Sequence, residues 1–124
     1  MTAAAKASRP SKPVKSATRA FRRQRTTALA LFPLALVFVA VVVALAGADY
    51  DTAKHYLGNP LLGAFFVLLI LAGVIHMRIG MMEIIDDYVP NAALRHLTLF
   101  LNYVFAVAVG LTCLYAVVKI VIGF

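Results

Sequence analysis

The chain has 124 residues, of which 63% are hydrophobic, and its mean hydropathy is +0.91. These values exclude an ordinary soluble enzyme domain and indicate a membrane protein. The net charge of +7 would suggest nucleic-acid binding in a soluble protein, but most of it lies in one short tail, so we expect a lipid bilayer and not nucleic acid as its partner.

Residues 1–25 form a basic tail without any acidic residue. Eight of the 12 Lys and Arg residues lie in it: Lys6, Arg9, Lys12, Lys15, Arg19, Arg22, Arg23 and Arg25. Its composition, rich in Ala, Ser, Lys and Arg, predicts a disordered arm attracted to anionic headgroups. A mitochondrial presequence is the alternative, because presequences are also basic and poor in acids.

Residues 26–124 are predicted to form a membrane-anchor domain with three transmembrane helices, at about 26–48, 59–79 and 97–118. Each segment is close to the roughly 20 residues that cross a bilayer as a helix, and an open sheet could not satisfy its backbone in lipid. We therefore expect an all-α membrane protein. The basic tail predicts an N-terminus on the inside of the membrane and a C-terminus on the outside.

His76 lies near the end of the second segment, and a histidine inside a bilayer is costly unless it has a partner. Ala72, Gly73 and Gly80 lie within about one helical turn of it. They would leave a shallow groove for a flat macrocycle, with His76 as the axial ligand of its iron. Alternatively, these small residues pack against a helix and His76 hydrogen-bonds across that contact. Arg78, nearer the interface, could reach a haem propionate.

The segment after His76 carries an acid and a phenol next to a helix-breaking residue. Pro90 should end any helix that continues past the second span, and Asn91 resembles the N-cap of the next one. Tyr88 can donate a hydrogen bond to a carbonyl oxygen while its ring stays at the membrane interface. Asp87 would oppose the dipole at a helix C-terminus, which a cation from a neighbouring subunit would explain.

These features together resemble the small hydrophobic membrane-anchor subunit of succinate dehydrogenase, the D subunit of respiratory complex II. The resemblance extends from residue 26 to the C-terminus. Its specific part consists of His76, Gly80, Asp87, Tyr88 and Val89, and residues 78–81 are similar to α-proteobacterial versions.

The resemblance implies that His76 is an axial ligand of haem b iron, with the opposite ligand from a companion cytochrome b subunit, the C subunit. Tyr88 would hydrogen-bond the carbonyl of the substrate ubiquinone, and Asp87 would support this site by orienting an arginine of the C subunit. An iron–sulfur subunit and a flavoprotein subunit would dock on the cytoplasmic face. Arg78 departs from members that lack a base there, so its propionate role rests on position alone.

The expected function is that of an anchor subunit of succinate:ubiquinone oxidoreductase, in the tricarboxylic acid cycle and respiratory electron transport. The chain would have no catalytic residue of its own and would act only as a subunit of the enzyme. We expect a multi-pass protein of a bacterial inner membrane, with the mitochondrial inner membrane as the alternative. Two other functions remain open, an anchor of a quinol:fumarate reductase and a small structural membrane protein without a redox role.

Overall fold

The computed structural model describes the backbone of residues 14–123 and the side chains of residues 18–123. The described backbone forms three long helices, α2 (Val14–Leu45), α4 (Pro60–Tyr88) and α5 (Ala92–Ile122), and one short helix, α3 (Tyr50–Leu57). All three long helices are apolar enough and long enough to cross a membrane. The predicted all-α fold with three spans is therefore confirmed.

The long helices extend past the limits that hydropathy predicted. At 29 residues, α4 is about 44 Å long, against about 30 Å of hydrocarbon. The predicted loop at residues 80–96 shrinks to residues 89–91, because polar residues at a membrane surface can continue a helix until a proline stops it. The C-terminal turns of α4, beyond the predicted end of the span at residue 79, are therefore ordered helix.

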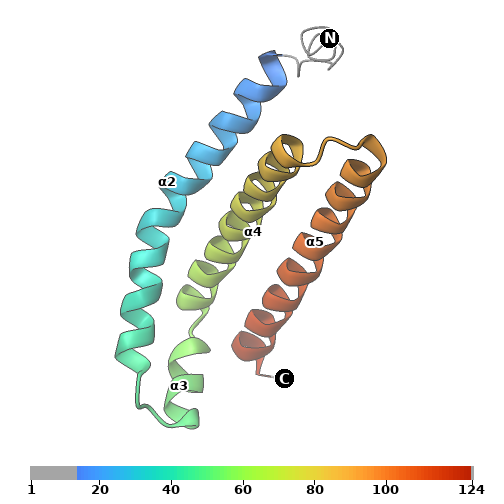
Figure 1. The fold of residues 1–124 in the computed structure, drawn as a ribbon. Helices are drawn as coiled ribbons and strands as arrows, with labels where there is room; N and C mark the ends of the chain where they lie inside the picture. Colours follow the sequence, from blue (N-terminus) through green and yellow to red (C-terminus); the bar gives the residue numbers. More distant parts are fainter. Residues whose placement is uncertain (1–13, 124) are drawn as a thin grey trace, which may run out of the picture.

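The first helix also begins earlier than predicted. Residues 14–25 belong to α2, although the sequence analysis assigned them to a disordered tail. They contain neither proline nor glycine and are rich in alanine and arginine, which favour helix. The tail before Val14 lies outside the described residues. Pro33 interrupts the hydrogen bonding of α2, and the helix bends in this part (Figure 1).

Local signals set the other helix ends. The Asn59 side chain accepts a hydrogen bond from the Leu61 amide at 2.9 Å and precedes Pro60, the first residue of α4. Asn91 does the same for α5, since its side chain accepts from two amides, those of Ala93 and Leu94. The predicted N-cap at Asn91 is confirmed. The short helix α3, in the connection between α2 and α4, was not predicted.

Helix α4 lies between α2 and α5 and packs against both (Figure 1). Few side chains are buried: among the described hydrophobic residues these are Ile79 and Ile85 of α4 and Ala106 of α5. Most apolar side chains of the spans face outward, as expected for helices whose surroundings are lipid or other subunits. His76, near the middle of α4, therefore lies at the centre of the bundle. Asp87 and Tyr88, at the end of α4, lie at its edge.

Helices α4 and α5 pack tightly at Gly63, where an added methyl group would lie 2.6 Å from Val121 Cγ2. We expect Gly63→Ala to lower the stability of the protein in detergent by about 1–2 kcal/mol, because overpacking outweighs the better helix propensity of alanine and a β-branched valine cannot easily rotate away. Thermal unfolding of the purified complex measures this effect.

Gly73→Ala is the matched control, because the nearest neighbour of its added methyl group, Leu31 Cδ2, lies at 4.0 Å. The double change Gly63→Ala with Val121→Ala should restore most of the lost stability, since it removes the clashing methyl group. Equal stability of Gly63→Ala and Gly73→Ala would contradict this account of the α4–α5 contact.

Candidate functional site

His76 lies a little past the middle of α4, half-buried, and its ring faces α2. Its Nδ1 atom is 3.1 Å from the hydroxyl oxygen of Thr27. The intramembrane imidazole thus has the polar partner that its cost in a bilayer demands. This contact corresponds to the alternative raised from the sequence, a hydrogen bond across a helix–helix interface.

The surroundings of Thr27 determine which atom donates in this contact. The Thr27 hydroxyl lies 2.9 Å from the carbonyl oxygen of Arg23 and 3.0 Å from that of Gln24. A hydroxyl has one proton and a carbonyl can only accept, so the hydroxyl donates to its own helix. Nδ1 of His76 donates to Thr27 in the tautomer in which that atom carries the proton. In the neutral imidazole, Nε2 is left with a free lone pair, which is what a metal ligand requires.

The small residues near His76 pack against α2. A methyl group added at Gly80 would lie 3.1 Å from Nε2 of Gln24, and one added at Gly73 would lie 4.0 Å from Leu31 Cδ2. The groove expected beside His76 is therefore filled by side chains of α2. A macrocycle could approach His76 from the Nε2 side, but it could not lie along this stripe of small residues.

Arg78 lies on another side of α4 from His76, because two residues correspond to about 200° of helical rotation. Its guanidinium is exposed and stacks over the ring of Tyr103 of α5, with 5.3 Å between the guanidinium carbon and the ring centre. Its carbonyl oxygen accepts a hydrogen bond from Asn102 Nδ2 at 3.1 Å. The structure thus links Arg78 to α5 and does not bring it together with His76.

Asp87 and Tyr88 form the last two residues of α4. Both are exposed, and 79% of the Tyr88 surface is accessible. Buried Ile85 holds this end of α4 in the bundle. Tyr88 lies 12 residues after His76, or about 18 Å along the axis, so the two candidate residues belong to separate sites. The phenol and the carboxylate are available to a molecule or a subunit that covers this end.

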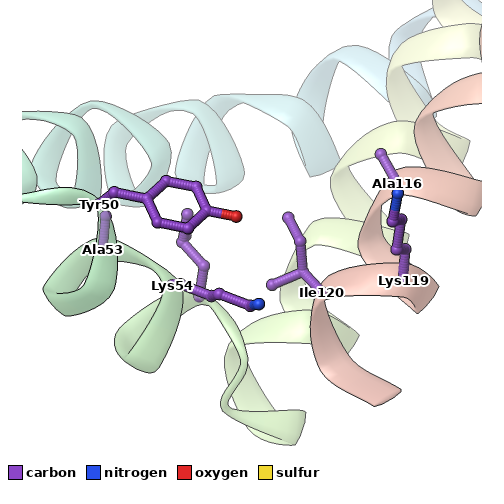
Figure 2. A pocket seen from close by; sticks show the side chains of 7 residues that line it. Tyr50, Ala53, Lys54, Ala116, Lys119 and Ile120 are labelled. Atoms are coloured by element: carbon purple, nitrogen blue, oxygen red, sulfur yellow. The ribbon is translucent and has the colours of Figure 1, made fainter. Parts of the chain in front are cut away.

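Two cavities lie at the opposite end of the bundle. One, of about 360 Å³, lies between α3 and α5, and Figure 2 shows Tyr50 and Lys54 of α3 near Ile120 of α5. The other, of about 440 Å³, is lined by apolar side chains from all four helices, such as Phe38 and Phe66. Neither of these two cavities is lined by a candidate residue.

Thr27 and Gln24 of α2 were not among the residues predicted from the sequence. The half-buried residues of α2 follow a spacing of three and four along most of the helix: Ala20, Gln24, Thr27, Leu31, Leu34, Val41 and Leu45. This spacing marks the face that packs against α4. Two polar residues on that face are the signal that could have identified a partner for the intramembrane histidine.

The residues of this chain that could ligate a metal suit a cofactor held by two chains together. Within the described residues, no group of three or more His, Cys, Asp or Glu side chains is placed to hold a metal ion. A haem needs only one residue from each of two chains as axial ligands, and His76 with a free Nε2 lone pair fits that requirement. The fold defines a class: a helical membrane protein with three candidate spans.

The chain belongs to the succinate dehydrogenase/fumarate reductase transmembrane subunit family, whose model matches residues 4–114. It is thus a multi-pass membrane anchor subunit of a succinate dehydrogenase or fumarate reductase complex, and it associates with the other subunits of that enzyme. Members of the family often bind haem b. No curated protein sequence and no solved structure matches the chain.

Proposed function

We propose that the chain is the D-type anchor subunit of a succinate:ubiquinone oxidoreductase in a bacterial inner membrane, with its N-terminus inside. In this role it supplies one axial ligand of haem b and part of the ubiquinone site. The observation that carries the proposal is His76, an intramembrane imidazole whose Nδ1 contacts the Thr27 hydroxyl at 3.1 Å, so that Nε2 would be left to bind iron. The family match supports the association of this chain with the other subunits of the enzyme.

His76 would hold the haem iron through Nε2, and a residue of the companion cytochrome b subunit would occupy the opposite position. The bound haem supplies a one-electron centre near the quinone site. Because the second axial ligand would come from the companion subunit, the haem would also join the two membrane subunits. A bis-histidine spectrum from this chain alone would contradict this arrangement.

Tyr88 would act on the substrate quinone at the inner surface of the membrane. Its hydroxyl donates a hydrogen bond to a quinone carbonyl oxygen and stabilises the negative charge that develops there during reduction. Its exposure fits this role, since the donor is not used by the chain itself in any described contact and the pocket walls would come from neighbouring subunits.

Asp87 would support the quinone site through a neighbouring cation. A carboxylate at the C-terminus of α4 opposes the helix dipole, so an arginine of the C subunit beside it would relieve that repulsion. The arginine would then be held next to the quinone. Arg78, which is exposed but stacks on Tyr103, would reach a haem propionate only by leaving that ring.

Purification of the complex from native membranes tests the assignment most directly. We expect a flavoprotein, an iron–sulfur protein and a second membrane subunit to copurify with this chain and with a haem b spectrum. Copurification without any haem would contradict the ligand role of His76. A preparation without a soluble dehydrogenase would contradict the proposed assembly as a whole.

A quinol:fumarate reductase anchor is the second candidate, because the family that matches the chain includes both enzymes. The two differ in direction and in quinone potential. The purified complex should oxidise succinate with ubiquinone faster than it reduces fumarate with a low-potential quinol. The reverse preference would assign the chain to a fumarate reductase.

A further inference from the structure

We infer that Thr27 is a positioning residue for the haem ligand: its hydroxyl accepts the Nδ1 proton of His76, and thereby orients the imidazole and raises the basicity of its Nε2 atom. This inference rests on the proposed haem ligation. It goes beyond that proposal because it assigns a role in setting the haem potential to a residue of α2, a helix without any ligand of its own.

The first step is the direction of the hydrogen bond. Thr27 has two backbone carbonyls within 3.0 Å, both from its own helix. If its hydroxyl donated to His76 instead, both carbonyl contacts would become repulsive contacts between lone pairs. The hydroxyl therefore stays directed at its own helix and acts as an acceptor for Nδ1–H at 3.1 Å. This arrangement selects the tautomer in which Nε2 can bind iron.

The second step is the rigidity of Thr27 itself. Contacts on both sides of the hydrogen bond hold α2 against α4: Gln24 lies beside Gly80, and Leu31 lies beside Gly73. Together with the pair Thr27 and His76, they follow one antiparallel register. A methyl group added at Gly80 would lie 3.1 Å from Gln24 Nε2, so the absence of a side chain at this position lets the helices approach closely enough for the hydroxyl to reach the ring, whereas Gly73 has room for a methyl group. The small residues of α4 therefore affect His76 indirectly, because the close packing of α2 against α4 brings Thr27 to the imidazole.

The third step is the effect on the metal. A ligating histidine that donates its other N–H to an oxygen has a fixed ring orientation and a more basic ligand nitrogen. A more basic ligand favours ferric over ferrous haem. Loss of the Thr27 acceptor should therefore raise the midpoint potential of haem b. We expect the ratio of the ligand's affinities for ferric and ferrous haem to change by up to about tenfold. For a one-electron couple, this change corresponds to a shift of about 59 mV in the midpoint potential.

The test uses the whole complex purified with Thr27→Val, which keeps the shape of the side chain and removes the acceptor. We expect an upward shift of the haem b potential and a changed low-spin ferric EPR signal, or a lower haem content. Thr27→Ser should restore wild-type values because it keeps the hydroxyl. If Thr27→Val fails to assemble, Thr27→Ala compared with Thr27→Ser provides the same contrast.

Thr98→Val is the matched control. Thr98 on α5 donates to the carbonyls three and four residues before it at 3.0 and 2.9 Å, as Thr27 does, and no contact with a histidine is described for it. Its replacement should leave the haem unchanged. Equal haem properties in wild type and Thr27→Val would overturn the inference, and so would equal shifts in Thr27→Val and Thr98→Val.

A failure of the inference can be separated from a failure of the proposed function. If His76→Ala loses haem b while Thr27→Val has wild-type potential and EPR signal, the ligand assignment stands and the role of Thr27 is refuted. If His76→Ala keeps an unaltered haem b, the ligation itself is refuted, and the inference about Thr27 falls with it.

Discussion

Replacement of His76 with alanine should remove haem b from the purified complex. The expected loss is at least about tenfold in haem content, because even the loss of an outer hydrogen-bond partner commonly weakens metal binding by about 10–100-fold, and this change removes the ligand atom itself. The measurement is the reduced-minus-oxidised optical spectrum of the complex, normalised to its flavin.

His55→Ala is the control for this experiment. His55 is exposed in α3, and its ring contacts Tyr56 at the opposite end of the bundle from Tyr88. Its replacement should leave the spectrum intact. A normal haem spectrum in the His76→Ala complex would show that the contact with Thr27 is only a hydrogen bond between packed helices, and the haem role would have to be withdrawn.

Replacement of Tyr88 with phenylalanine should lower quinone reduction and leave the transfer of electrons from succinate to an artificial dye intact. Removal of one hydrogen-bond donor to a developing oxyanion costs up to about 10²–10³-fold in other enzymes, and we expect a loss of at least about tenfold here. Dye reduction should not change, because in the proposed complex succinate would be oxidised in the soluble subunits. Steady-state assays with the two acceptors measure both effects.

Tyr50→Phe is the matched control, because Tyr50 is 77% exposed and Tyr88 is 79% exposed, but Tyr50 lies in α3 at the opposite end of the bundle. It should retain full quinone reduction. Wild-type quinone turnover in Tyr88→Phe would remove Tyr88 from the site, whereas a loss of dye reduction would indicate a defect in assembly.

Local features of the sequence predicted the ends of the helices better than hydropathy did. Asn91 and Pro90 identify the boundary between α4 and α5 correctly, since a cap and a missing amide act within one helical turn. Hydropathy placed these ends in loops because it reports where a helix leaves hydrocarbon. It does not report where the backbone stops being helical, as residues 80–88 of α4 demonstrate.

The candidate residues themselves were accessible from the sequence, but their relation to one another was not. His76 was identified from the cost of a buried imidazole, and Tyr88 and Asp87 from their place beside Pro90. The distance between His76 and Tyr88 could be calculated only after the structure showed that α4 continues without a break to Tyr88. The partner of His76 was missed because Thr27 lies 49 residues away in the sequence, and the face of α2 that carries Gln24 and Thr27 was not recognised as the one that packs against α4.

The sequence by itself determined the three spans, the central histidine and the phenol and carboxylate next to a helix break, because hydropathy and capping are properties of short segments. Only the tertiary structure decided which way His76 faces and what the small residues contact. Both depend on which sides of the helices meet. In α4, apolar residues surround the helix on nearly all sides, so periodicity does not distinguish a lipid-facing side from a packed one. The packing of Gly73 and Gly80 against α2 resolved that choice and brought Thr27 to the imidazole.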